Sequence, residues 1–208
     1  MSWNPVGRQL TLLKAVVVLL ALLPFARIVW MTVSGQLVEP IEFITRATGD
    51  WTLYFLCIAL AVTPLRRLTS WNWLLKLRRM LGLFAFFYAV LHFTTFLWFD
   101  HFFDLTAMWK DVLKRPFITV GFSAFVLLIP LALTSTKGMQ RRLGGKRWMW
   151  LHRLIYLIAP LGILHFWWMK AGKNDFAEPI AVGLVVALLL GARIYWAWHR
   201  RRRTAGAI

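Results

Sequence analysis

The sequence predicts an all-α membrane protein, with six transmembrane helices packed as one bundle and residues 1–208 forming a single domain. Three observations predict this fold class. Hydrophobic residues make up 60% of the chain, whereas soluble domains contain about 45–50%. Six apolar runs are long enough to cross a hydrocarbon core about 30 Å thick. Basic residues gather in alternate connections between these runs, which is the pattern of a multi-pass membrane protein.

The predicted spans follow one another through short connections, which leave no room for an additional soluble domain. They lie near residues 11–33, 48–65, 80–99, 117–134, 150–169 and 179–198. The first run follows Arg8 and Lys14, as the apolar core of a signal peptide would. No small-residue cleavage signal comes after it, so we expect this helix to be retained.

The charges of the chain divide into two groups. Basic residues without any carboxylate fill the connections 66–79 and 137–147 and the segment 200–203. All eight acidic residues lie around the first, third and fifth connections: Glu39, Glu42, Asp50, Asp100, Asp104, Asp111, Asp175 and Glu178. The positive-inside rule therefore predicts that both termini and the second and fourth connections are cytoplasmic. This topology explains the net charge of +17, so we expect a lipid bilayer and no nucleic acid as partner.

Composition and patterning disfavour several other classes. No acidic residue occupies the middle of a predicted span, and the two halves of the chain show no convincing repeat, which weakens a transporter or pump hypothesis. The single cysteine, Cys57, lies in an apolar run and is interpreted as a small buried residue. The chain has no CxxCH sequence for covalent haem and no cysteine pair for zinc or an iron–sulfur cluster.

Three of the five histidines lie inside predicted spans, where an imidazole is costly. His92 follows Arg79 by thirteen residues, or about 20 Å along a helix, and His165 follows Arg153 by about 18 Å. Both rings are therefore expected at similar depth, in the outer half of the membrane. His152 begins the same span as His165 and lies about 20 Å from it, near the opposite face.

Two imidazoles at one depth on neighbouring helices can bind a haem iron from both of its faces. This hypothesis assigns His92 and His165 to an outer haem iron and His152 to an inner one, and the absence of CxxCH makes the haem b-type. Histidines that only hydrogen-bond neighbouring helices are the alternative. Zinc is disfavoured because no fourth ligand or carboxylate lies nearby. An imidazole near each membrane face indicates a route for electrons.

Several segments resemble one bacterial membrane family. They are LRRMLGLFAFFYAVLH, KRPFITVG, ALTSTKGMQRRLG and KRWMWLHRLIYLIAPLGILH, and the similarity continues in order from LLPFARIVW onward. These segments are similar to MsrQ, the family of haem-binding membrane subunits of the bacterial periplasmic methionine-sulfoxide reductase system. That family belongs to the ferric-reductase-like transmembrane group.

The resemblance implies a cytochrome b of the bacterial inner membrane that has no catalytic site of its own. Electrons would come from the quinone pool or a cytoplasmic flavin reductase. They would pass to a periplasmic molybdenum-cofactor subunit that reduces methionine sulfoxide in oxidised proteins. The resemblance also implies FMN as a cofactor, and His92, His152 and His165 match the family's haem-associated histidines.

Three arginines are candidate partners for haem propionates. The wider group has a fourth histidine at about the position that Arg78 occupies here, fourteen residues before His92. Arginine stays protonated and is not an ordinary iron ligand, so Arg78 is expected to pair with propionates or to mark the membrane face. Arg27, near the outer end of the first span, and Arg153, beside His152, are assigned the same two roles.

Two further functions compete with electron transfer to a periplasmic reductase. A self-contained ferric or oxygen reductase would need a fused flavin and nicotinamide domain, for which this chain has no room. A small transporter or structural membrane protein would use its histidines only for packing.

Overall fold

The computed structural model describes residues 5–172 and 174–205, and all regular structure in this part of the chain is helical. Six helical stretches are long and apolar enough to cross a membrane: Arg8–Val33, Pro40–Thr69, Asn72–Asp100, Pro116–Leu133, Gly145–Ala171 and Ala177–His199. The predicted all-helical fold with six candidate spans is thereby confirmed. The assignment of both termini to the cytoplasm stays a prediction from charge.

Some spans contain more than one helical element. The elements in chain order are α1 (Arg8–Val33), α2 (Pro40–Thr69), η1 (Asn72–Leu74), α3 (Leu75–Thr95), η2 (Phe96–Asp100), α4 (Leu105–Lys114), α5 (Pro116–Leu133), α6 (Lys137–Leu143), α7 (Gly145–Leu151), η3 (His152–Leu154), α8 (Ile155–Ala171) and α9 (Ala177–Ala205). The third span joins η1, α3 and the π-helical turn η2, and the fifth joins α7, the 3₁₀ turn η3 and α8. Two short helices, α4 and α6, occupy connections in which the sequence predicted no helix.

Local sequence signals explain where several helices begin. Pro40 and Pro116 lie in the first turns of α2 and α5, where the N–H that proline lacks would have no helical partner. Asp104 precedes α4, and its carboxylate accepts hydrogen bonds from the N–H groups of Thr106 (2.9 Å) and Ala107 (3.0 Å). This cap stabilises a helix that is too short to be stable by itself.

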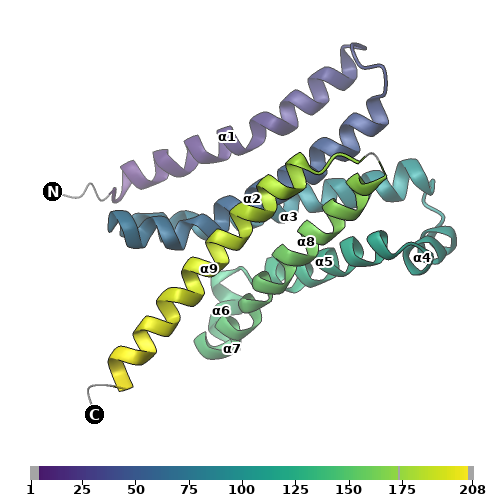
Figure 1. Ribbon diagram of the computed structural model, residues 1–208. Coiled ribbons are helices and arrows are strands. Elements are labelled where there is room, and N and C mark those ends of the chain that lie inside the picture. Colours follow the sequence, from purple (N-terminus) through teal and green to yellow (C-terminus); the bar gives the residue numbers. More distant parts are fainter. Residues whose placement is uncertain (1–4, 173, 206–208) are drawn as a thin grey trace.

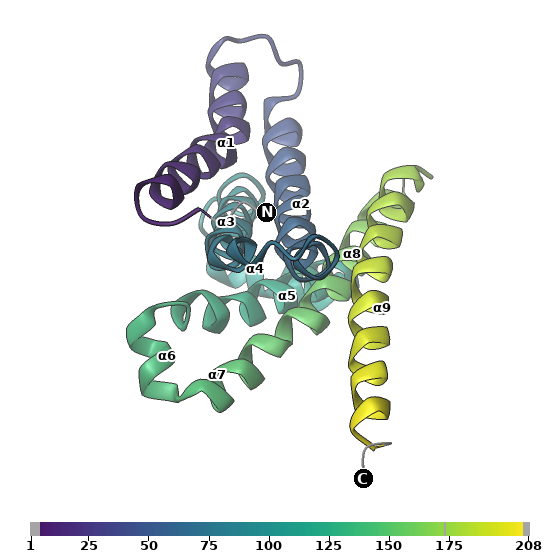
Figure 2. The same cartoon turned by 90° about the vertical axis from the view of Figure 1, so that its left-hand side faces the viewer.

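The helices pack mainly as two antiparallel pairs. The contact between α2 and α3 is the largest in the bundle, followed by that between α5 and α8, and these helices run through its centre (Figure 1). Figure 2 shows α1 and α9 on opposite sides of α2. Both of these outer helices expose many large apolar side chains, as expected where lipid covers a helix.

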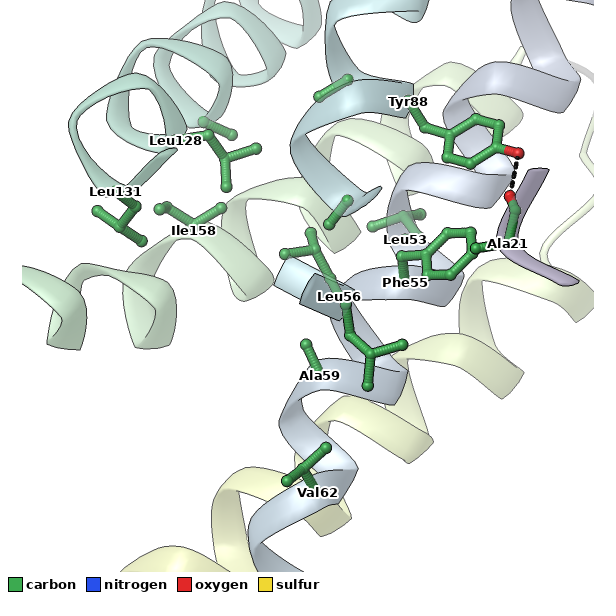
Figure 3. Close-up of a cluster of buried hydrophobic side chains, with 14 of the residues drawn as sticks. Ala21, Leu53, Phe55, Leu56, Ala59, Val62, Tyr88, Leu128, Leu131 and Ile158 are labelled. Carbon is green, nitrogen blue, oxygen red and sulfur yellow. Dashed lines mark hydrogen bonds between the residues drawn. The ribbon is translucent and has the colours of Figure 1, made fainter. Parts of the chain in front are cut away.

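The apolar core lies between the pairs and extends to the buried ring of Tyr88 (Figure 3). Its members from α2, α5 and α8 include Leu53, Leu56, Leu128 and Ile158. The Tyr88 hydroxyl donates to the carbonyl of Ala21 (2.8 Å) and accepts from the N–H of Phe25 (3.1 Å). In an uninterrupted helix those two groups pair with each other. Tyr88 therefore inserts into the hydrogen-bond ladder of α1 beside Pro24.

The bundle has two chemically different ends. We call one the acidic end: it comprises the α1–α2 connection, α4 with its flanking turns and the α8–α9 connection, which contain or adjoin every acidic residue except Asp50, which lies in the half of α2 nearer this end. The other is the basic end, which comprises the α2–α3 connection, α6, α7 and the last turns of α9. In Figure 1 the acidic end lies at the right and the basic end at the left and lower left.

Candidate functional site

A cavity of about 270 Å³ lies between α2, α3, α5 and α8, in the half of the bundle nearer the acidic end. Its walls are apolar and rich in aromatic rings: Phe93, Phe96, Phe117, Phe122, Phe125 and Phe166. His92 of α3 and His165 of α8 both line it, and their ring centroids are 6.1 Å apart at an interplanar angle of 72°. The structure thus brings together the two histidines that depth alone predicted to be level.

Backbone carbonyl groups fix both rings. The Nδ1 atom of His92 lies 2.9 Å from the carbonyl oxygen of Thr45, and that of His165 lies 2.7 Å from the carbonyl oxygen of Phe117. A carbonyl oxygen can only accept, so Nδ1 carries the proton in each ring and Nε2 keeps its lone pair. Among the described residues, neither Nε2 has a hydrogen-bond partner. Histidines that ligate metals are oriented in this way by a bond from the other ring nitrogen.

Two glycines give these rings their space. A Cβ atom added to Gly49 of α2 would lie 3.1 Å from Cε1 of His92, and one added to Gly121 of α5 would lie only 2.6 Å from Nδ1 of His165. Any side chain at Gly121 would therefore displace the ring. These glycines could not be predicted from the sequence, because a glycine inside a span gives no sign of the helix face on which it lies.

The ring separation fits a single metal ion between the two histidines. Metal–nitrogen bonds of about 2 Å on both sides would hold two imidazole centroids about 6 Å apart, and the observed distance is 6.1 Å. The described residues contain no group of three or more His, Cys, Asp or Glu that could hold an isolated ion. A bound iron would therefore need further donors from a ligand, such as the four nitrogens of a porphyrin.

Charged side chains line the cavity where it approaches the acidic end. Arg46 and Arg115 are on its wall, together with Asp50 and Asp100. Arg115 pairs with Asp111 (2.7 Å). Arg46 and Arg115 are the arginines on this wall. Neither was predicted from the sequence, because both lie close to carboxylates in sequence and resemble ordinary surface charges.

Arg27 lies outside the wall of this cavity. It lines a second cleft of about 490 Å³ between α1 and α2, which shares Arg46 and Asp50 with the first. Arg27 is therefore separated from the histidine cavity by those two side chains, and any contact with a ligand there would be made at its edge.

His152 has a different environment at the basic end. Its Nε2 lies 3.1 Å from the hydroxyl of Thr134, and its ring lies against Trp148 with centroids 4.0 Å apart. The Thr134 hydroxyl donates its one proton to the carbonyl of Pro130 (2.6 Å), so the Nε2 of His152 is the donor in their contact. Within the described part of the chain, no second histidine has a ring contact with His152.

The two remaining arginine candidates also lie at the basic end. Arg78 is half-buried at the start of α3 and lies close enough to His152 to interact with it electrostatically. Arg78 is also close to Tyr156 and to Arg193 of α9. Arg153 is exposed. The structure therefore groups Arg78 with His152 and leaves Arg153 at the surface.

Comparisons with known proteins agree on one family. Residues 48–163 match the family described as "Ferric reductase like transmembrane component", a range that includes His92 and His152 and ends two residues before His165. No solved structure matches the chain.

Three similar relatives share the printed name "Protein-methionine-sulfoxide reductase heme-binding subunit MsrQ". That of Herminiimonas arsenicoxydans is 69% identical over 98% of this chain and 94% of its own. Those of Ralstonia nicotianae and Polaromonas naphthalenivorans are 56% and 54% identical, and each match covers 95% of this chain and 92% of the relative.

Proposed function

The chain belongs to the ferric-reductase-like transmembrane family and, within it, to the MsrQ subunits, and on this premise we propose that it is a haem-binding membrane cytochrome b. It would receive electrons from the quinone pool or a cytoplasmic flavin reductase. It would deliver them across the inner membrane to a periplasmic molybdenum-cofactor methionine-sulfoxide reductase, and so support the repair of oxidised periplasmic proteins. The relatives' printed names support haem binding and the link to methionine-sulfoxide reductase.

One observation carries the proposal: His92 and His165 meet in an apolar cavity with their Nε2 atoms unpaired. A bound haem supplies one-electron redox chemistry at its iron, which these two Nε2 atoms would ligate. The carbonyl groups of Thr45 and Phe117 hold both rings in the ligating tautomer. The aromatic walls exclude water, and this lowers the polarity around the metal.

We assign the propionate contacts to arginines near each proposed haem. Arg46 and Arg115 line the histidine cavity and are the first candidates there, with Arg27 at its edge. Arg78 and Arg153 are the candidates beside His152, which would ligate an inner haem and relay electrons toward the paired site. FMN is proposed from the family resemblance alone, and the chain's own part is electron transfer without an independent catalytic site.

Absorption spectroscopy of the purified protein tests this proposal. We expect a Soret band in freshly isolated protein and its loss, for the outer haem, in both His92→Ala and His165→Ala. His199→Ala is the matched control, because His199 lies on α9 at the basic end, outside the cavity. Full haem content in both site variants would refute the pairing, and protein that is isolated without haem would refute the function.

A further inference from the structure

Arg193 of α9 links three helices at the basic end. Pro64 has no N–H group, so the carbonyl of Leu60, four residues earlier in α2, lacks its helical donor. The Nη2 of Arg193 donates to this carbonyl at 2.6 Å. Its Nη1 donates to the hydroxyl of Tyr156 on α8 at 2.9 Å, and the guanidinium carbon lies 5.4 Å from the centroid of the Tyr156 ring.

A second guanidinium approaches the same hydroxyl. Arg78 of α3 is close to both Tyr156 and Arg193, and both arginines are half-buried. Arginine is always charged in proteins and can only donate hydrogen bonds. Two positive groups therefore converge on one phenol oxygen, which cannot neutralise them.

Among the described residues, no Asp or Glu lies beside these charges. All eight acidic residues lie in the half of the bundle nearer the acidic end. In the described residues, the Arg and Lys ion pairs are those of Arg46, Arg115 and Lys170, which lie in that half too. The Nε of Arg193 is buried and has no partner within the described residues. The cluster thus has a spare donor and a net positive charge, and both features call for an anion from outside the chain.

We propose that Arg78, Arg193 and Tyr156 bind a phosphate oxyanion, supplied by the headgroup of an anionic phospholipid, which would occupy Arg78 in place of an inner-haem propionate and leave Arg153 as the propionate candidate there. Guanidinium groups bind phosphate through paired, charge-assisted hydrogen bonds, and basic pockets between transmembrane helices hold anionic headgroups. The position suits a lipid: Arg193 follows Ala177, the start of α9, by sixteen residues, or about 24 Å, close to the far side of a hydrocarbon core of about 30 Å.

The site opens toward the lipid rather than toward the core. Tyr156 is 41% exposed, and Ile194 and Tyr195, which follow Arg193 on α9, are 70% and 55% exposed. Of the six spans, α9 also has the smallest buried share, 6%. A phosphate bound between α3, α8 and α9 would therefore hold the most loosely packed helix against the bundle.

Lipid binding in nanodiscs tests the site. The full chain is placed in phosphatidylcholine discs with and without phosphatidylglycerol, and thermal unfolding and retained phosphatidylglycerol (by native mass spectrometry) are measured. We expect phosphatidylglycerol to raise the Tm of the wild type. Arg193→Gln and Arg78→Gln should bind it about tenfold more weakly, since each loses one charged hydrogen-bond donor. Glutamine at position 193 ends about where Nε of Arg193 lies, so this variant also loses the bond to the Leu60 carbonyl, and the retained lipid, not the Tm alone, reports on the phosphate contact.

The matched control is Arg79→Gln, the exposed neighbour of Arg78 with the same loss of charge. It should retain the lipid response of the wild type. An unchanged response in Arg193→Gln, or an equal loss in Arg79→Gln, would overturn the proposal, because the effect would then reflect only the net charge of the basic end.

Two further measurements identify the source of the oxyanion. If inorganic phosphate in detergent stabilises the wild type but not Arg193→Gln, while phosphatidylglycerol has no effect, the site is supported and its ligand is a soluble phosphate compound. If Arg193→Gln loses haem absorbance but retains phosphatidylglycerol as the wild type does, the arginines serve a cofactor carboxylate and the proposal fails. The lipid readouts need no electron transfer, so they can fail independently of the proposed function.

Discussion

The two ends of the bundle differ in the partners that they provide for buried and half-buried cations. At the acidic end, the nearly buried Lys170 (9% exposed) pairs with Asp175 at 3.0 Å and Glu178 at 2.9 Å. At the basic end, Arg78 and Arg193 converge on Tyr156 without a carboxylate. The charge of Lys170 is thus balanced by carboxylates of the protein itself, whereas the described residues place no carboxylate beside Arg78 and Arg193.

The histidines of the two halves also differ, in the hydrogen bonds that their ring nitrogens make. His92 and His165 carry their protons on Nδ1 and face each other with unpaired Nε2 atoms, whereas His152 uses Nε2 to donate to Thr134. The first pair is arranged for a metal without any rearrangement, and His152 is not. The two halves therefore differ in which imidazole nitrogen is bound by the protein itself, Nδ1 in the cavity and Nε2 at the basic end.

Replacing the histidines tests this comparison most severely. His165→Ala should abolish haem binding in the cavity, because one of the two proposed iron ligands is lost. His152→Ala should spare that haem and interrupt electron supply from the basic end. The measurements are the haem-to-protein ratio and anaerobic reoxidation of the reduced protein by the periplasmic partner. Normal electron delivery by His152→Ala would exclude a relay at the basic end.

The glycines beside the rings should show the next largest effect. In Gly121→Ala the new Cβ would lie 2.6 Å from Nδ1 of His165, so the ring must move and haem content should fall sharply. The strain should also lower the free energy of unfolding by about 1–3 kcal/mol. Gly49→Ala should be milder, because its closest approach to His92 is 3.1 Å.

Gly82→Ala is the control for both glycine variants, because a Cβ there meets nothing within 4 Å. It should keep the haem content of the wild type and should gain slightly in helix stability. Equal haem loss in Gly82→Ala and Gly121→Ala would show that the effect arises from the helices rather than from the ring contact.

Removing the charge of Lys170 should have a moderate effect on stability and little on haem. Lys170→Met leaves Asp175 and Glu178 without their shared partner, but both carboxylates are about half exposed, so water replaces much of the loss. We expect a decrease of about 1 kcal/mol in the free energy of unfolding, measured by denaturant titration. The exposed Lys110 provides the control variant Lys110→Met, and an equal decrease there would contradict a specific role for Lys170.

The smallest effect is expected at Thr134. Thr134→Val removes the hydroxyl that holds Nε2 of His152 and should cost about 1 kcal/mol. It should leave the cavity haem unchanged, and any haem bound by His152 should be retained, because Nε2 is then free to ligate. Loss of cavity haem on Thr134→Val would show that the two halves are coupled more tightly than their contacts indicate.

Simple counting along the chain located the central pair of histidines. The rise per residue placed His92 and His165 at one depth, and the structure puts them 6.1 Å apart. Counting does not tell in which direction around the helix each ring points in the folded protein. On an ideal helix, thirteen residue steps would turn His165 away from His152 by about 140°. The 3₁₀ turn η3 (His152–Leu154) and Pro160 within α8 interrupt the ideal helix between those two rings, and neither interruption follows from hydropathy.

The sequence by itself determined the six candidate spans, the separation of acidic from basic connections and the level of each histidine along its helix, because hydropathy, charge and axial rise are properties of one segment at a time. Only the tertiary structure decided which groups hold the rings. Thr45 and His92 are 47 residues apart, Phe117 and His165 are 48 apart, and Leu60 and Arg193 are 133 apart. Such contacts depend on how helices rotate and pack against one another, and that choice is made jointly by side chains from the whole bundle.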